Sequence, residues 1–219
     1  MGIMEVFDKT DLNRVRRLPA RGQYDRATID AIVDEALICH VAFAVDGQPF
    51  VIPTIHARMG DEIVLHGAPA SRLLKHIVAG NPIAIAVTLV DGLVLARSVF
   101  HSSMNYRSAV LFGHGRILDG DDEKLAALEA ITEHLARGRW IDARRPTQQE
   151  LDATIVVAVA IDSASAKVRT GPPGDDEDDY ALPIWAGVLP FQLQPQTPVP
   201  DPRLADDIAI PTYVTNYVR

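Results

Sequence analysis

The sequence is poor in cysteine and contains no long uncharged apolar run. Cys39 is the one cysteine among 219 residues, so the chain cannot form an internal disulfide. It stands inside the apolar run ALICHVAFAV, which favours a buried structural thiol over a reactive nucleophile. No apolar run reaches the length of a membrane span, and the N-terminal residues lack the apolar core of a signal peptide. We therefore expect a cytoplasmic protein with no membrane partner.

An excess of positive charge is also missing. The formal net charge is -8, whereas nucleic acids and anionic membranes both require a basic surface on their partner. The charge therefore argues against a nucleic-acid-binding role, although a local basic pocket for a small phosphate is compatible with it. With 47% hydrophobic residues, the chain has enough apolar material for a sizeable core.

Several sequence signatures of catalysis and phosphate binding are absent. The chain has no GxGxxG, GxxxxGK[ST], GxSxG or HExxH motif. No sequence motif therefore indicates a common phosphate-binding loop, an esterase or a zinc protease. Seven histidines are present, but they show no tight pairing on a helix face. We predict no metal site.

Strand signals dominate what is present. Asp46-Gly47 and Asp91-Gly92 are both signals for two-residue hairpins, and Gly113 interrupts a later strand, which indicates a bulge or a close backbone approach. The pattern predicts about seven strands, mostly joined by hairpins, with a few helices between them. Short antiparallel connections favour a closed barrel over a doubly wound parallel sheet, and one domain is the simplest account.

Two segments concentrate side chains that suit a ligand. The first, LHGAPASRLLKHI, places His66, Ser71, Arg72 and Lys75 at the junction between a strand and a short helix. A serine hydroxyl, a guanidinium and helix-start N–H groups suit a phosphate. An N-cap serine followed by two solvated basic residues explains the same pattern equally well.

The second segment is HSSMNYRSAVLFGHG at residues 101–115. A polar turn is one interpretation, since asparagine and serine side chains serve the backbone in turns. A turn has no use for an adjacent Tyr-Arg-Ser, however, which favours a ligand site. Alternation along a strand predicts Tyr106 and Ser108 on one side and Arg107 on the other. The candidate ligand residues in this segment are Asn105, Tyr106, Arg107 and Ser108.

The run from Leu65 to Gly113 resembles the flavin-nucleotide-binding split-barrel proteins related to pyridoxamine 5'-phosphate oxidase. Within them it is most similar to the branch that includes the nitroimidazole-resistance (Nim) proteins. Further matches are RGQYDRATIDAIVDEA at 21–36, KVRTGPP at 167–173 and DDYALPIWAGVLP at 178–190. Several blocks in the same order are more specific than any single motif.

The resemblance implies a mainly β fold with flanking helices, a six-stranded antiparallel split β-barrel of the FMN-binding type. It also implies a homodimer with FMN, or FAD as the alternative, in a groove at the dimer interface. We accordingly divide the chain into an N-terminal arm (1–22), a flavin-binding domain (23–190) and a C-terminal extension (191–219) packed on the domain or on the partner copy.

The resemblance also assigns roles to residues. It implies that the Ser71-Arg72 region holds the flavin phosphate and that the segment from Asn105 to Ser108 lies beside the flavin. By position, Pro53 and Thr54 would line the isoalloxazine through their backbone. His66 matches a histidine of the Nim branch and is the candidate substrate contact. The full predicted flavin-binding set is Pro53, Thr54, His66, Ser71, Arg72, Lys75, Asn105, Tyr106, Arg107 and Ser108.

Two departures from that family argue against pyridoxamine-phosphate oxidase activity itself. Leu73 stands where those oxidases have a basic residue, and the tail PTYVTNYVR lacks their C-terminal Arg-x-His signature. We predict instead an oxidoreductase that passes electrons from a reduced nicotinamide to a small acceptor such as a nitroaromatic or a quinone. A non-catalytic flavin-binding, redox-sensing dimer is the alternative, and a haem-binding split barrel is a more distant one.

Overall fold

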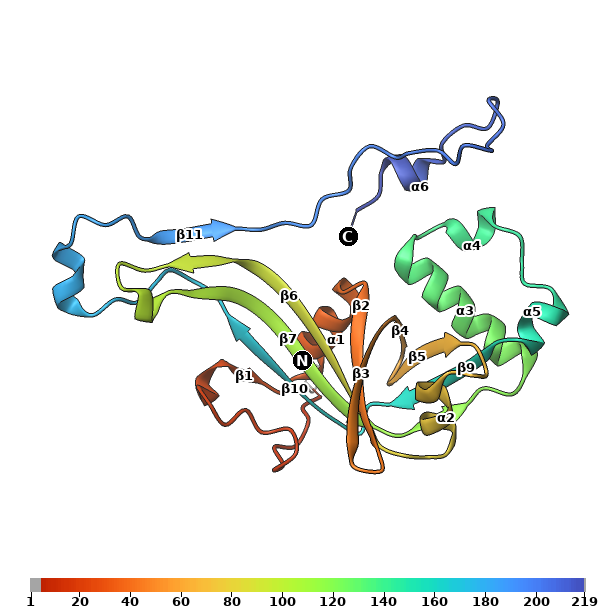
Figure 1. Ribbon diagram of the computed structural model, residues 1–219, viewed down its shortest axis with the longest axis horizontal. Coiled ribbons are helices and arrows are strands. Elements are labelled where there is room, and N and C mark those ends of the chain that lie inside the picture. Colours follow the sequence, from red (N-terminus) through yellow and green to blue (C-terminus); the bar gives the residue numbers. More distant parts are fainter. Residues whose placement is uncertain (1–4, 219) are drawn as a thin grey trace.

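The computed structural model describes residues 5–218 as two antiparallel sheets with helices on their flanks (Figure 1). The helical elements are η1 (Pro19–Arg21), α1 (Arg26–Glu35), α2 (Arg72–Val78), η2 (Val99–His101), α3 (Asp121–Leu135), α4 (Arg139–Asp142), α5 (Gln148–Asp152), η3 (Glu177–Ala181) and α6 (Thr212–Thr215). The strands are β1 (Gly22–Gln23), β2 (Ile38–Val45), β3 (Gln48–Ile55), β4 (Ala57–Met59), β5 (Glu62–Gly67), β6 (Ile83–Leu95), β7 (Ser103–Gly113), β8 (Gly115–Ile117), β9 (Ile155–Ala160), β10 (Ser163–Arg169) and β11 (Gly187–Pro190).

The larger sheet has seven strands in the order β1-β10-β7-β6-β2-β3, with β11 paired to β6. The smaller sheet has four strands in the order β4-β5-β9-β8. Every ladder between these strands is antiparallel, and none joins the two sheets within residues 5–218. The predicted mainly β split-barrel class is confirmed, while short strands such as β4 and β8 raise the strand number above the predicted six. The expectation of a closed barrel is wrong, because the strands of residues 5–218 form two separate sheets that no ladder joins into a closed ring.

The hairpin between β2 and β3 turns at Asp46 and Gly47, as the sequence predicts. Their φ angles are 50° and 78°. A two-residue type I′ turn requires positive φ at both central residues, and its twist matches that of the flanking strands. The Asp-Gly pair therefore sets the register in which Val45 lies opposite Gln48.

The prediction of a second hairpin at Asp91-Gly92 is wrong. β6 runs through both residues, and its register against β7 shifts between Val90 and Gly92. Gly92 has a φ of 158°, and a Cβ placed on it would lie 2.6 Å from the carbonyl oxygen of Leu189 in β11. The same residue types thus form a bulge that lets β11 approach, since a bulge and a tight turn both favour glycine.

Two apolar clusters hold the sheets and helices together. The larger lies between the two sheets and includes fully buried Ile29 from α1 and Ile77 from α2. The smaller lies on the other side of the four-stranded sheet, where Ile131 of α3 packs with Val64 and Val156. Burying an isoleucine side chain contributes about 1.5–3 kcal/mol, so these clusters fix where α1, α2 and α3 sit.

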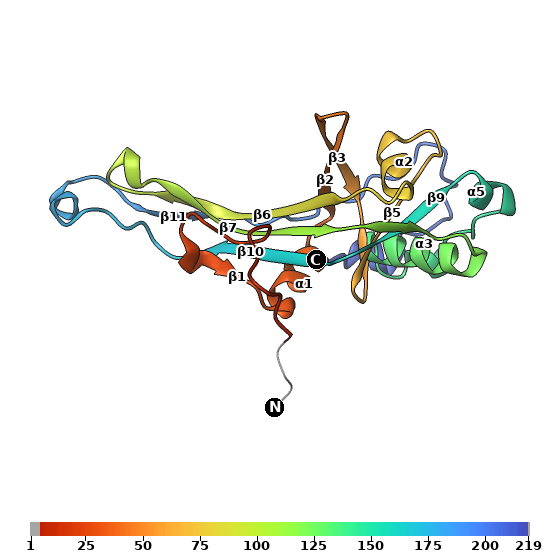
Figure 2. The ribbon, with the colours of Figure 1, turned by 90° about the horizontal axis from the view of Figure 1, so that it is seen from below.

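The seven-stranded sheet has one side that the core does not use. α1 lies on the core side of β6, β7 and β10, below them in Figure 2. Cross-strand registers place a second set of side chains on the opposite side, which we call the open face. The open face includes Ile38, His40, Val51, Pro53, Ala86, Thr88, Val90, Met104, Tyr106 and Ser108. Ile38, Val51 and Val90 are 48%, 63% and 44% exposed, which is high for such residues.

The N-terminal segment packs on the larger sheet, whereas the C-terminal segment is largely exposed and reaches α4. Asn13, which is 2% exposed, donates from Nδ2 to the carbonyl oxygens of Asp8 and Ala164, at 2.8 and 3.0 Å. The C-terminal segment follows β11 back along the molecule to α6, where Tyr213 donates a hydrogen bond to Asp142 (Figure 1). Residues 1–4 and 219 of the predicted arm and extension lie outside the described residues, and the division into arm, domain and extension stays a prediction.

No helix within residues 5–218 is long and apolar enough to cross a membrane. The cytoplasmic location stays a prediction.

Gly113 confirms the predicted close backbone approach and provides a test of the packing between the sheets. A Cβ placed on it would lie 1.8 Å from the carbonyl oxygen of Ala160. We expect Gly113→Ala to lower the free energy of unfolding by about 2–3 kcal/mol in urea denaturation, because a backbone atom cannot move aside cheaply. The control is Gly174→Ala, since nothing lies within 4 Å of its Cβ position. Equal stability of the two variants would contradict the packing.

Candidate functional site

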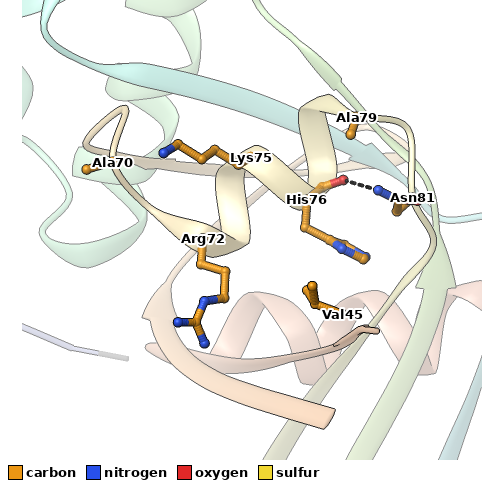
Figure 3. Close-up of a pocket in the computed structure, with 7 residues that line it drawn as sticks. All are labelled: Val45, Ala70, Arg72, Lys75, His76, Ala79 and Asn81. Carbon is orange, nitrogen blue, oxygen red and sulfur yellow. Dashed lines mark hydrogen bonds between the residues drawn. The ribbon is translucent and has the colours of Figure 1, made fainter. Parts of the chain in front are cut away.

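The N-terminal part of α2 forms one wall of a basic pocket, which we call the α2 pocket. It has a volume of about 440 Å³ and is shown in Figure 3. In Figure 3 His76 points from α2 towards Val45 at the end of β2, whereas Arg72 and Lys75 leave the helix in two other directions. The lining residues are Val45, Ala70, Arg72, Lys75, His76, Ala79 and Asn81. None of them is acidic, so the pocket carries positive charge.

The positive charges of the α2 pocket are not neutralised by nearby carboxylates among residues 5–218. The guanidinium carbon of Arg72 lies 4.4 Å from the ring centroid of Phe50 in β3. Within residues 5–218, no carboxylate pairs with Arg72 or Lys75. Stacking on an aromatic ring orients a guanidinium and leaves its N–H groups free for an anion.

Ser71 has the role of an N-cap. Its Oγ accepts a hydrogen bond from the backbone N–H of Leu74 at 3.4 Å. Such a bond satisfies one of the free N–H groups at the start of α2. Of the two interpretations of Ser71, the capping role is therefore seen directly, and its phosphate contact stays a prediction.

His66 lies apart from the α2 pocket. It is in β5 opposite Val156, on the same side of the strand as Val64, and this side faces α3. Its Nδ1 is buried and has no hydrogen-bond partner among the described residues. Burial lowers the pKa of His66, so the ring is neutral at pH 7.

The segment from Asn105 to Ser108 lies in β7, and its alternation is confirmed. Tyr106 and Ser108 are opposite Val90 and Thr88 on the open face, whereas Arg107 is opposite Leu89 on the core side. The strand thus offers two of the four predicted residues to the open face.

Arg107 is bound by two carboxylates. Its Nη2 lies 2.7 Å from an oxygen of Asp91 and 2.8 Å from an oxygen of Glu35, and its Nη1 also pairs with Glu35. Hydrogen bonds to Glu35 and then to Asp91 raise the pKa of Arg107. Its guanidinium therefore joins the end of α1 to the bulge of β6, and its predicted flavin contact stays a prediction.

Asn105 is 8% exposed and uses both ends of its amide. Its Oδ1 accepts a hydrogen bond from Nη1 of Arg169, and its Nδ2 donates to the carbonyl oxygen of Gly171 at 3.2 Å. The sequence reasoning missed Arg169 as a candidate. The pattern KVRTGPP shows a turn after the strand, but nothing local links Arg169 to a residue 64 positions earlier.

Pro53 and Thr54 lie in β3, at the edge of the larger sheet. Pro53 is opposite His40 on the open face, and an edge strand tolerates proline because one side of it has no ladder to complete. Thr54 is opposite Cys39, which is fully buried. Burial raises the pKa of the Cys39 thiol to about 12, which confirms a structural rather than a nucleophilic cysteine.

One copy of the chain does not bring the two predicted groups together. No residue of the segment 105–108 lines the α2 pocket. Pro53, Tyr106 and Ser108 share the open face, while Arg107 points to the core side and His66 lies on the α3 side of the other sheet. Within residues 5–218, no group of three or more histidine, cysteine, aspartate or glutamate side chains gathers to hold a metal ion.

Residues 25–168 match the family model described as pyridoxamine 5'-phosphate oxidase. The flavocytochrome Anf3 from Azotobacter vinelandii is 39% identical, with 94% of this chain and 96% of that chain covered and a TM-score of 0.88. The FAD and haem binding protein from Mycobacterium smegmatis is 38% identical, with 90% and 96% covered and a TM-score of 0.85.

A candidate 5-nitroimidazole antibiotic resistance protein from Bacteroides thetaiotaomicron is 25% identical, with 66% of this chain and 84% of that chain covered and a TM-score of 0.55. The predicted similarity to the nitroimidazole-resistance branch is therefore confirmed. No curated protein matches the chain.

Replacing Arg107 tests whether it is a structural ion-pair centre. Arg107→Met removes the guanidinium that pairs with both Glu35 and Asp91. We expect the free energy of unfolding at pH 7 and low salt to fall by about 1–2 kcal/mol, since these side chains are about a third exposed and water screens them. The control is Arg116→Met on the surface, where a change within about 0.5 kcal/mol is expected. A loss no larger than that of the control would contradict the structural role.

Proposed function

The chain belongs to the pyridoxamine 5'-phosphate oxidase family, and from this premise we propose that it is a flavin-binding electron-transfer protein that also holds a haem. Two relatives that match at least 90% of this chain are described as a flavocytochrome and as an FAD and haem binding protein. FAD is the flavin we propose, and FMN is the alternative. Haem binding, a distant alternative from the sequence alone, becomes part of the proposal.

The α2 pocket is the structural observation that supports flavin binding. Arg72 and Lys75 place two unpaired cations beside one cavity, and Phe50 holds the guanidinium in place. Charge-assisted hydrogen bonds from such groups suit a phosphate, and a planar guanidinium can bind two of its oxygens at once. In the proposal these two residues bind the flavin phosphate.

The open face supports a place for the flavin ring between two copies of the chain. It carries exposed apolar side chains beside small and polar ones, which suits a flat aromatic ring with polar edges. A single copy keeps Tyr106 and Ser108 away from the α2 pocket. In the proposed homodimer, a second copy on the open face supplies its own segment 105–108 to the flavin held by the first.

His66 is the histidine that we propose as the haem ligand. An axial haem ligand is commonly a neutral imidazole nitrogen, and a single protein ligand is sufficient. Burial keeps His66 neutral, and its Nδ1 has no partner among the described residues. His114 and His134, by contrast, have hydrogen-bond partners in Asp162 and Ala36. We therefore propose that His66 would hold the haem iron, rather than serve as a substrate contact.

When bound, the flavin would exchange electrons singly or in pairs and the haem iron singly. The chain's own residues bind and orient these groups, so no acid–base pair is required of them. The proposed donor is a reduced nicotinamide, and the proposed acceptor is a small molecule such as a nitroaromatic or a quinone. If the protein binds flavin but does not transfer electrons between any such donor and acceptor, the alternative holds, which is a non-catalytic, redox-sensing flavin protein.

Replacing Arg72 tests the phosphate contact. We expect Arg72→Ala to weaken flavin binding by about 1.5–3 kcal/mol, because a charge-assisted hydrogen bond is lost. The measurement is a fluorescence titration of flavin-free protein with FAD and with FMN. Arg144→Ala is the control, since Arg144 is a surface arginine paired with Glu150. Unchanged affinity of the Arg72 variant would sink the assignment.

Replacing His66 tests the haem ligand. We expect His66→Ala protein, reconstituted with haem, to lose the Soret band of the wild-type complex while it keeps flavin absorbance, because only the iron ligand is removed. The control is His114→Ala, an exposed histidine between β7 and β8. A variant that gives the wild-type Soret spectrum would rule out His66 as the ligand.

A further inference from the structure

A second basic pocket lies where β10 ends, on the opposite side of β10 from β7. β1 pairs with β10 here, so η1 and the loop after Arg169 come together. The pocket has a volume of about 400 Å³ and is lined by Arg21, Arg169, Thr170 and Gly174 among others, with no acidic residue. We call it the β10 pocket.

The two arginines of the β10 pocket are not neutralised. Within residues 5–218, no hydrogen bond or ion pair holds the side chain of Arg21. Arg169 donates to neutral acceptors, the amide oxygen of Asn105 and the carbonyl oxygens of Gly171 and Pro172. Most other arginines with defined contacts pair with carboxylates, and these are Arg16, Arg26, Arg58, Arg97, Arg107, Arg116, Arg139 and Arg144.

The two guanidinium groups also repel each other. Burial and then the positive charge of Arg21 lower the pKa of Arg169. Two like charges beside one cavity repel each other. Carboxylates are plentiful in this protein, whose net charge is -8, yet none of those described pairs with either arginine. An anion between them would turn this repulsion into two favourable contacts.

Asn105 and two backbone carbonyl oxygens hold the guanidinium of Arg169, while η1 fixes the backbone of Arg21. Asn105, buried at the end of β7, fixes the guanidinium of Arg169 and the loop at Gly171, whose φ is 96°. The turn of η1 presents Arg21, with the N–H of Arg21 donating to the carbonyl oxygen of Leu18 at 3.0 Å. The guanidinium of Arg169 is therefore preorganised, which reduces the entropy lost when a ligand binds.

We propose that Arg21 and Arg169 form a binding site for a phosphate group of a dinucleotide. Two guanidinium groups beside one cavity match the several oxygens of a phosphate or pyrophosphate. The β10 pocket shares no residue with the α2 pocket, so it suits a phosphate other than the one bound there. The inference deepens the proposed function, because FAD and the nicotinamide carriers are both dinucleotides.

The first test is a calorimetric titration of inorganic pyrophosphate into flavin-free protein at low ionic strength, with every protein carrying Arg72→Ala so that the α2 pocket does not bind the probe. In this background we expect saturable binding when Arg21 and Arg169 are both present, and at least about tenfold weaker binding with Arg21→Met or with Arg169→Met. Arg116→Met, which removes a surface arginine paired with Glu62, should bind within about twofold of the protein that carries Arg72→Ala alone. Unchanged affinity with Arg21→Met would overturn the proposal.

Stability measurements keep this test independent of folding defects. The side chain of Arg21 has no defined hydrogen bond to lose, so Arg21→Met should melt no lower than the wild type without ligand. In the Arg72→Ala background, added pyrophosphate should raise the melting temperature of the protein that keeps Arg21 and leave that of Arg21→Met unchanged. An equal rise in both proteins would contradict the site.

The second test distinguishes the two dinucleotides. If the site binds FAD, Arg21→Met should lose affinity for FAD and keep its affinity for FMN. If it binds the electron donor, the variant should bind FAD normally and bind NADH or NADPH more weakly. A variant that loses pyrophosphate binding but binds all of these as the wild type does would overturn the dinucleotide assignment. Because pyrophosphate is measured without flavin, failure of flavin binding would leave the first test intact.

Discussion

The antiparallel ladder between β6 and β7 is the constraint on which the rest of the structure depends. It joins residues 83–94 to residues 103–113, and its two sides have different surroundings. One side packs on α1 and the core, while the other becomes the open face. At the far end of the ladder, the bulge at Asp91 meets Arg107, and Asn105 reaches Arg169. A shift of one residue in this register would exchange the two sides.

Electrostatics separates structural arginines from those available to a ligand. Arg107 is surrounded by Glu35 and Asp91, so its charge is used inside the protein. Arg72 is oriented by the ring of Phe50, which leaves its N–H groups for an anion. Arg169 is held by an amide and backbone carbonyl oxygens, and neither Arg169 nor Arg21 pairs with a carboxylate among residues 5–218. The exposed fraction of these side chains would not distinguish the two kinds of arginine, because they differ in the group that contacts each guanidinium.

Local signals in the sequence predicted local structure well and distant pairings poorly. Asp46-Gly47 forms the predicted hairpin because its neighbours are also its strand partners. Asp91-Gly92 misled because β11, which requires the bulge, comes almost a hundred residues later. The alternation of Tyr106, Arg107 and Ser108 was predictable from strand geometry. The partners of Arg107 were not, since Glu35 belongs to a helix 72 positions earlier.

The central claim is that the protein binds a flavin nucleotide, and its absorption spectrum is the direct test. Flavin-free protein is mixed with a slight excess of FAD or FMN, passed through a desalting column, and its spectrum is recorded. The account predicts that the eluted protein shows flavin absorption in the blue part of the visible spectrum, at a fixed molar ratio of flavin to chain. Protein that elutes colourless after incubation with either flavin would contradict it.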